Sequence, residues 1–527
     1  MAATTHPGVY IEELPSGART LTGVPTSTTA FIGRARRGPV NRPVRVRTAA
    51  EYAGLFGGLW QPAPMSYAVT QFFDQGGGDA LVVRVFNGSV EGSTATITLP
   101  TADAPLVLEA AGPGAWGQAL RATVDHGTDE ADPRLFNLIV EELDGPGGTN
   151  VRAAESFRNV SVAPGSPRFG DSIVNATSQL VRIRQSAPAN TRPVSGTFAA
   201  AGGTGDDGAA IADAHVTGNA HDHTGMFALE ETDSFNLLCI PPLATDTDVA
   251  GTTWAAAAAY CQRRRAMLII DAPAAWRTSA RGAITSAAAG IDSLRRTVGH
   301  AVPNAAVYFP RLRMADPLDG NRIADFAPCG AVAGIIARTD AQRGVWKAPA
   351  GTEASFSGID GFTCALTDTE NGQLNSLGLN CLRSLPAIGH LVWGARTLAG
   401  ADALSSEWKY LPVRRLALFL EDSLYRGTRW AALEPNDEPL WGQIRLIGGA
   451  FLQDLFRAGA FAGTTPREAY FVTCDRETTT RRDIESGIVN VVIGFAPLKP
   501  AEFVIVEIRQ SAKSSDDGRA GTGEPAR

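Results

Sequence analysis

The chain has 527 residues, of which 44% are hydrophobic and 19% charged, and its formal net charge is −7. This length exceeds that of one ordinary hydrophobic core and predicts about two to four domains, some nested within others. The modest negative charge is not gathered in blocks, which argues against a nucleic-acid-binding protein with a basic surface.

The predicted elements begin with one strand in HPGVYIEELPSG, residues 6–17, which has a proline and a glycine on each side and no hairpin partner beside it. A short strand is expected at Thr29–Gly33. A helix follows over 48–56, where Thr48 and Glu51 have capping-box spacing. A second helix near Met65–Asp74 and a buried strand in DALVVRVF complete the first part of the chain.

From about residue 88 to 230 the composition shifts to Thr, Gly, Ala, Asp and Pro, with short alternating apolar runs and many turn signals. This pattern predicts a β-rich inserted domain. It ends in the Gly-rich stretch 199–225, which we expect to be flexible and to face solvent.

The middle of the chain alternates short apolar strands with helices. The strands are FNLLCIPP, AMLIIDAP and NAAVYFPR, and the helices between them are TWAAAAAYCQRRR and ARGAITSAAAGIDSLRRTV. Such alternation implies right-handed crossovers and a largely parallel sheet.

The last part contains an amphipathic helix over 438–461, with Ile444, Ile447, Phe451 and Leu455 on one face, packed on a small sheet. A final strand, AEFVIVEIRQ, precedes a polar tail over 511–527 that has no core-forming residues.

Targeting signals and disulfides are not indicated. The N-terminal segment MAATTHPGVY lacks the basic and apolar regions of a secretory signal, and no apolar run approaches the roughly 18 residues of a membrane helix. We therefore expect assembly in the cytoplasm and no direct membrane insertion. The six cysteines are scattered without a C-x-x-C pair, which favours reduced, buried thiols over a zinc site or a disulfide framework.

Asp271 is the best candidate for a catalytic residue, because it follows the apolar run Met267–Ile270 at the carboxyl end of a strand, where open α/β sheets bind ligands. The sequence has no phosphate-binding G-K-[ST] loop, so a cap or turn role for Asp271 is favoured. No G-x-S-x-G or other nucleophile motif is present.

For two further clusters of residues a structural role is favoured over a functional site. His221 and His223, with Asp222 and His215 nearby, are possible metal ligands, but a polar loop is favoured. The basic runs at 34–37 and 263–265 lack interleaved aromatic residues, so solvated faces or inter-subunit salt bridges are favoured over nucleic-acid contacts. The residues alone therefore predict no catalytic, cofactor-binding or metal-binding site.

Several strings, in order, resemble the tail sheath proteins of contractile phage tails and related contractile injection systems. They are HPGVYIEE, TAAEYAGLFGG, SYAVTQFFDQGGGDALVVRV, AGIIARTDAQRGVWKAPAG, VWGARTL, EWKYLPVRRLALFLEDSL, EPNDEPLWGQIRLIGGAFL and GFAPLKPAEFVIVEIRQ. The resemblance covers about the first 90 and last 190 residues and fades between about 90 and 230, where such proteins carry variable outer insertions. One departure is Gly351 in KAPAG, where the family pattern has Asn.

The resemblance implies an α/β and α+β multidomain fold. The expected parts are an N-terminal linker arm (1–25), a nested α/β middle domain (26–90 with 230–344), a β-rich inserted outer domain (91–229), a C-terminal α+β inner sheath domain with its arm strand (345–510), and a disordered tail (511–527). It implies no enzyme activity, no cofactor and no metal.

The resemblance also implies a subunit that polymerises as stacked hexameric rings around an inner tube. Such a sheath contracts from a metastable extended state and drives the tube through a target envelope. The implied partners are other sheath subunits, the inner tube protein, and baseplate and terminator or cap proteins, without nucleic acid. The particle is a phage tail or a phage-tail-like particle, either cytoplasmic or released.

Both arms are expected to exchange strands with neighbouring subunits, because strand addition satisfies backbone groups that an isolated strand leaves to water. The residues implied are Val9, Tyr10, Ile11, Glu12, Glu13, Leu14, Phe503, Val504, Ile505, Val506, Glu507 and Ile508. Two alternatives remain open: an α/β enzyme with a site near Asp271, and another structural component of the same machine, such as a tube or baseplate protein.

Overall fold

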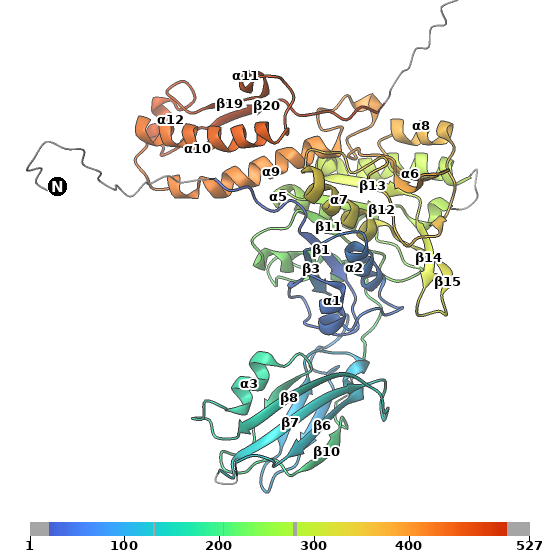
Figure 1. The fold of residues 1–527 in the computed structure, drawn as a ribbon, viewed down its shortest axis with the longest axis vertical. Coiled ribbons are helices and arrows are strands. Elements are labelled where there is room, and N and C mark those ends of the chain that lie inside the picture. Colours follow the sequence, from blue (N-terminus) through green and yellow to red (C-terminus); the bar gives the residue numbers. More distant parts are fainter. Residues whose placement is uncertain (1–20, 130–131, 204, 278–281, 503–527) are drawn as a thin grey trace, which may run out of the picture.

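The computed structural model describes residues 21–129, 132–203, 205–277 and 282–502. Figure 1 shows three parts along the longest axis of the molecule. A lobe built from β4 to β10, here called the β lobe, lies at the bottom; a body of sheet and helices lies in the middle; and a helical lobe with α9 to α12 lies at the top. The mixed α/β character expected from the sequence is confirmed.

The body is built on an eight-stranded sheet in the order β18-β17-β13-β12-β11-β1-β3-β2. The strands are β1 (Thr29–Gly33), β2 (Val44–Val46), β3 (Ala80–Arg84), β11 (Leu237–Cys239), β12 (Met267–Asp271), β13 (Ala305–Phe309), β17 (Asn380–Leu385) and β18 (Gly389–Val392). All neighbours from β3 to β17 pair in parallel, and the edge strands β2 and β18 are antiparallel. The largely parallel sheet predicted from the alternation of strands and helices is therefore confirmed.

Helices cover both faces of this sheet, as strands that are apolar on both sides require. One face packs α5 (Gly251–Arg263) and α6 (Gly282–Val298), and the other packs α1 (Ala49–Phe56), α2 (Pro64–Asp74) and α7 (Cys329–Arg343). Thr48 caps α1 as predicted, its hydroxyl accepting from the backbone N–H of Glu51 at 3.0 Å. Helices α2 and α7 approach closely because Gly330 has no side chain: a Cβ there would lie 2.0 Å from the carbonyl oxygen of Ala68.

Smaller elements extend the body at its edges. A three-stranded sheet has the order β15-β14-β16. Its strands and the neighbouring helix are β14 (Leu312–Asp316), β15 (Arg322–Phe326), β16 (Gly361–Phe362) and α8 (Asp368–Ser376). Strands β17 and β18 come from the segment 345–510, so the main sheet runs across the domain boundary that the sequence predicts at residue 345.

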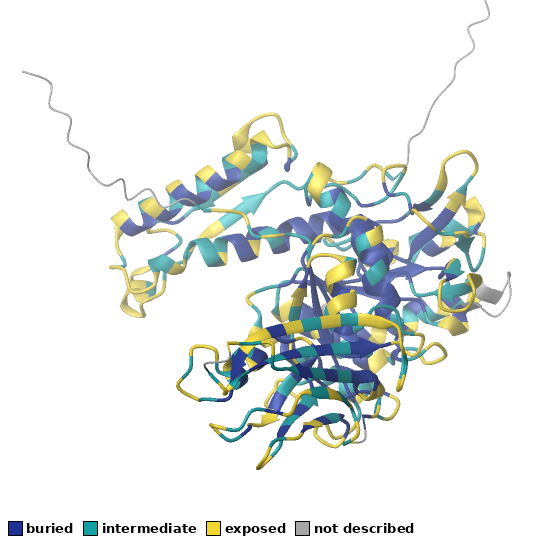
Figure 2. Ribbon diagram, turned by 60° about the horizontal axis from the view of Figure 1, so that its bottom comes forward, coloured by how far each residue is buried: buried dark blue, intermediate teal, exposed yellow. Residues whose placement is uncertain are grey.

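The β lobe consists of two antiparallel sheets, β10-β6-β7-β8 and β4-β5-β9, which share one core. Its elements are β4 (Thr96–Leu99), β5 (Leu106–Ala110), β6 (Leu120–Asp125), β7 (Leu135–Leu143), β8 (Val151–Ser161), α3 (Gly170–Thr177), β9 (Val181–Gln185) and β10 (Gly196–Ala199). Buried residues alternate with more exposed ones along β6 and β7 (Figure 2). This alternation is the pattern from which the strands are predicted.

The stretch 199–225, predicted to be flexible and exposed, is partly built into the body. Ile211 and Val216 are 7% and 0% exposed and join the core under α5. Helix α4 (Asp213–Thr217) is held there by the Asp213 carboxylate, which accepts from the hydroxyl of Thr253 at 2.7 Å and from the N–H of Ala250 at 2.9 Å. The prediction was wrong for Ile211 and Val216, whereas most other described residues of the stretch are exposed or half-buried. Single apolar residues in a polar string show no periodicity, although a few suffice to anchor the chain.

The helical lobe contains α9 (Leu411–Gly427), α10 (Glu438–Arg457), α11 (Pro466–Ala469), β19 (Tyr470–Thr473), α12 (Arg481–Glu485) and β20 (Val492–Phe495). The predicted buried face of α10 is present: Ile444, Ile447 and Phe451 are buried, and Leu455 is half-buried. As predicted, α10 packs on a small sheet, formed by β19 and β20.

Candidate inter-subunit site

The small sheet of the helical lobe has unpaired outer edges. Strands β19 and β20 pair antiparallel, and no third strand joins them within the described residues. The N–H of Ala496 donates to the carbonyl of Ala469 at 2.8 Å. Because hydrogen-bonded and non-bonded pairs alternate, the backbone groups of Val472 and Ile493 then point to the outer edges. These are the groups to which a further strand bonds.

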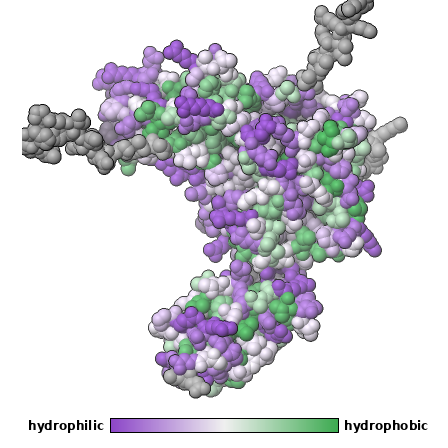
Figure 3. Space-filling model, viewed as in Figure 1, coloured by the Kyte–Doolittle hydropathy of each residue, from purple (hydrophilic) through white to green (hydrophobic). Residues whose placement is uncertain are grey.

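Hydrophobic side chains lie exposed around this sheet. Phe471 is 55% exposed and Val492 46%, and Ile484, Ile488 and Val491, which precede Val492 in the chain, are 37–47% exposed. Figure 3 shows hydrophobic residues among hydrophilic ones on the helical lobe. Exposed apolar clusters of this kind mark surfaces that bind another protein. Together with the open strand edges, they make the β19–β20 sheet the candidate site for strand addition.

The N-terminal end of the described chain is fastened along α9. Leu21 packs against Gly427 at the end of this helix. The N–H of Val24 donates to the hydroxyl of Ser423 at 3.2 Å, and Arg415 donates to the carbonyl of Thr26 at 2.9 Å. The chain therefore runs back along α9 before it enters β1.

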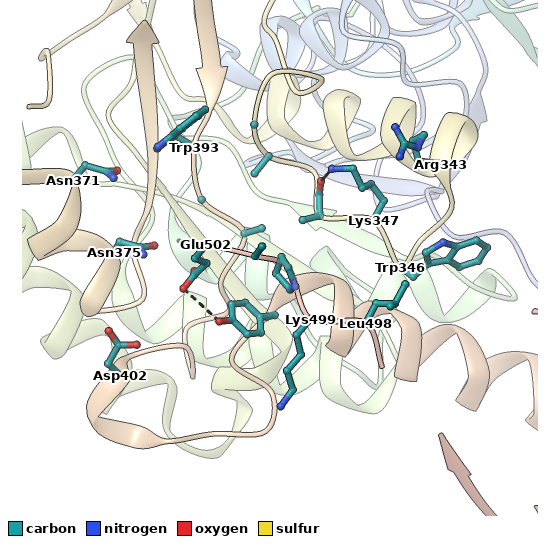
Figure 4. A pocket seen from close by; sticks show the side chains of 18 of the residues that line it. Arg343, Trp346, Lys347, Asn371, Asn375, Trp393, Asp402, Leu498, Lys499 and Glu502 are labelled. Atoms are coloured by element: carbon teal, nitrogen blue, oxygen red, sulfur yellow. Dashed lines mark hydrogen bonds between the residues drawn. The ribbon is translucent and has the colours of Figure 1, made fainter. Parts of the chain in front are cut away.

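The C-terminal end of the described chain is fastened near the beginning of the same helix. The Glu502 carboxylate accepts from Arg396 at 2.7 Å, and the hydroxyl of Tyr410, the residue before α9, lies 3.4 Å from it. Glu502 and Tyr410 both line a cavity of about 840 Å³, in which Figure 4 shows Glu502. The two ends of the described chain thus lie at opposite ends of a 17-residue helix, roughly 25 Å apart at 1.5 Å per residue.

The predicted exchange strands, 9–14 and 503–508, lie outside the described residues, as do the tail over 511–527 and most of the arm over 1–25. Strand exchange stays a prediction. Sequence reasoning did not single out β19 and β20 as an acceptor. The available signal was two short runs, YFVT and VVIGF, separated by polar residues and each too brief to stand out from a loop.

Asp271 is sealed inside the body. It ends β12, is 4% exposed, and accepts from the backbone N–H of Cys329, the first residue of α7, at 2.7 Å. Desolvation by burial raises its pKa to about 6, against the opposing effects of the Cys329 hydrogen bond and the Arg311 charge. Asp271 therefore caps α7, which is the role favoured from the sequence, and its carboxylate has almost no surface with which to touch a substrate.

We expect this carboxyl to make the protein less stable as the pH rises. Its folded pKa of about 6 exceeds the ordinary value of 3.8, so its favourable contribution is complete below the ordinary value and is lost as the pH rises through about 6. The loss amounts to about 3 kcal/mol. Asp271→Asn keeps an acceptor for Cys329 without the charge. Urea unfolding should therefore show that the free energy of unfolding of the variant, relative to that of the parent, is higher at pH 8 than at pH 4.5. An equal difference at the two pH values would contradict the assignment.

The histidine cluster forms no metal site. The ring Nδ1 of His215 accepts from the N–H of Ala212 at 3.0 Å, and that of His223 lies 3.8 Å from the Glu230 carboxylate. No group of three or more His, Cys, Asp or Glu in the described ranges has the geometry to hold a metal ion. All six cysteines are free and five are buried, as predicted. No described helix has the length and apolarity of a membrane span.

Several arginines of the two basic runs form ion pairs and hydrogen bonds within the subunit. Arg37 is buried against Glu142 of β7, whose other carboxylate oxygen lies 2.9 Å from Arg36. Arg264 donates to the carbonyl of Leu229 at 2.9 Å. The expectation of solvated faces or inter-subunit bridges was wrong for these three arginines, because folding brings distant acceptors to them. The Glu142 contacts fasten the β lobe to the body.

Comparisons with known proteins give a consistent result. Residues 214–398 match the family model of the phage tail sheath protein central domain. A putative prophage major tail sheath protein of Pseudomonas aeruginosa (strain UCBPP-PA14) is 26% identical over 245 residues, which are 42% of this chain and 60% of that protein. The chain therefore matches about three fifths of the length of this curated relative.

Two solved structures are similar over nearly the whole chain. The anti-feeding prophage helical sheath in its contracted state has a TM-score of 0.57 and 21% identity, covering 97% of this chain and 100% of that one. The PVC sheath complex of an extracellular contractile injection system, also contracted, has a TM-score of 0.56 and 22% identity, covering 97% and 99%. At these identities the likeness establishes the fold.

Gly351, which departs from the expected pattern, has φ +92°, and Asn is one of the few other residues that readily adopt positive φ.

Proposed function

We propose that this chain, which belongs to the family of contractile tail sheath proteins, is a structural subunit of a sheath that surrounds an inner tube. The family is structural and not a family of enzymes. The observation that carries the proposal is the two-stranded β19–β20 sheet with open edges, in the same lobe as α9. The segments next to the two predicted exchange strands contact this helix at its two ends, Val24 at Ser423 and Glu502 at Tyr410. The burial of Asp271 removes the main support for the alternative of an enzyme.

In the proposed assembly, subunits form stacked hexameric rings, and strands 9–14 and 503–508 join the β19–β20 sheets of neighbouring copies. Each donated strand satisfies the outward backbone groups of Val472 or Ile493. It also covers part of the exposed surface of Phe471 and Val492. The arms thereby link rings while the bodies rotate.

Contraction in this proposal exchanges one packing of nearly rigid subunits for another of lower free energy. The buried contacts between the three parts of the chain support a rigid subunit. Glu142 joins the β lobe to the body, and Asp340 pairs with Arg415 to join the body to the helical lobe. The remaining proposed partners are an inner tube protein, a baseplate and a terminator or cap protein, in a phage tail or phage-tail-like particle assembled in the cytoplasm.

Electron microscopy of the purified full-length chain tests the proposal. In negative stain it should show long ribbed tubes or stacked rings. A monodisperse small oligomer across a wide range of salt and protein concentrations would contradict a sheath subunit. Such a result would favour another component of the same machine.

A further inference from the structure

Arg396 is a fully buried cation between the main sheet and α9. Its exposure is 0%, and its backbone is tied to β17, since its N–H donates to the Asn380 side chain at 2.7 Å and its carbonyl accepts from that side chain at 2.8 Å. A guanidinium this deep requires a charged partner as well as hydrogen bonds. One Nη donates to the carbonyl of Asn375 at 2.7 Å and to Asp402 at 2.9 Å.

The main charged partner of Arg396 is Glu502, the last described residue. The two groups form a fork, with Nε 2.7 Å from one carboxylate oxygen and Nη2 2.5 Å from the other. The Glu502 side chain is 16% exposed, whereas that of Asp402, the second carboxylate, is 51% exposed. Paired charge-assisted bonds of this kind fix both distance and orientation. Figure 4 shows Glu502 and Asp402 among the side chains that line the cavity.

The chain between β20 and Glu502 is held less firmly. Ala496 accepts from the N–H of Ala462 at 2.8 Å, and Pro497 forms a bridge with Phe461. Residues 498–501 then line the 840 Å³ cavity, and none of their side chains makes a hydrogen bond or ion pair with another described residue. Glu502 is therefore the last fastening before the predicted exchange strand.

We propose that Arg396 and Glu502 form a clamp that fixes the root of the C-terminal arm, residues 496–502, to the main sheet. This inference rests on the proposed exchange of strand 503–508. A fixed root reduces the conformational freedom that the arm loses when its strand is donated, which favours assembly. A force applied to the arm is also transmitted through Arg396 to β17. The main sheet of the body, and not the two-stranded sheet of the helical lobe, then bears this force.

The clamp is tested with full-length Glu502→Gln and Glu502→Ala. The matched control is Glu141→Gln, which makes the same change at a partly exposed pair of the β lobe, Arg121–Glu141, 2.8 Å apart. Hydrogen exchange of peptides covering 496–502 is measured before polymerisation, and tube formation is followed by light scattering. Both Glu502 variants should raise exchange locally and slow tube formation at least tenfold, with the control unchanged.

The outcome is decided by the local measurement. Parent-like exchange and tube formation in both Glu502 variants would overturn the clamp. If Glu502→Ala does not fold, Glu502→Gln and Arg396→Lys, which keeps the charge but loses the fork, still decide it by the same measurements. Deletion of 503–527 separates the clamp from the proposed function: tubes that form without these residues contradict C-terminal strand exchange, whereas exchange at 496–502 still reports on the clamp.

Discussion

Deletion of residues 1–17 should abolish polymerisation and leave a folded subunit. The described contacts of the N-terminal root begin at Leu21 and continue through Val24 and Thr26, and the first strand of the main sheet begins at Thr29. The deletion therefore removes none of them. If strand 9–14 supplies even about 3 kcal/mol to each contact between subunits, its loss weakens association roughly hundredfold at every contact. Thermal unfolding should stay at the parent midpoint while negative-stain images show no tubes.

Two further variants separate the strand from the segment around it. Deletion of residues 1–5 leaves HPGVYIEE intact and should polymerise like the parent. Ile11→Pro keeps the length of the arm but removes one backbone donor from the strand, so it should reproduce most of the defect. Tubes formed by the chain that lacks 1–17 would show that the N-terminal arm is not needed for assembly.

The body could be predicted from the sequence because its strands are uninterrupted apolar runs. Met267–Asp271 and Ala305–Phe309 are buried along their whole length, and helices lie between them at lengths that suit parallel crossovers. The place of β17 could not be predicted in this way. The packing of the whole chain, and not a local pattern, determines which segment pairs with the edge of β13.

The candidate site was predictable only in part. The arms are visible because proline and glycine isolate them and because they resemble strands of a known family. The clamp is not visible, since Arg396 and Glu502 stand 106 residues apart and each is a single charge in an otherwise unremarkable string. The arginine runs show the same limit. A run of arginines indicates a basic segment, but it does not show whether its side chains will pair with a carboxylate such as Glu142 or face solvent.

Asp340→Ala should destabilise the subunit by roughly 3–5 kcal/mol, a large part of the 5–15 kcal/mol typical of a domain. The side chains of Asp340 in α7 and Arg415 in α9 are each 3% exposed, and they form a fork with N–O distances of 2.7 and 2.5 Å. Removal of the carboxylate leaves a buried guanidinium whose remaining hydrogen bond to a described residue is to the carbonyl of Thr26. Urea unfolding of unpolymerised subunits measures the change.

Two controls show why the loss arises from an unpaired buried charge. Glu485→Ala breaks the exposed Arg481–Glu485 pair and should cost less than about 1 kcal/mol. The double variant Asp340→Leu with Arg415→Met replaces both charges by apolar groups and should recover much of the loss, because buried ion pairs seldom exceed well-packed hydrophobic residues in stability. A cost below about 1 kcal/mol for Asp340→Ala would mean that other contacts hold α9 to the body. The segments that precede the two predicted exchange strands both contact α9. A weak Asp340–Arg415 pair would therefore also remove the main support for a rigid connection between these segments and the body.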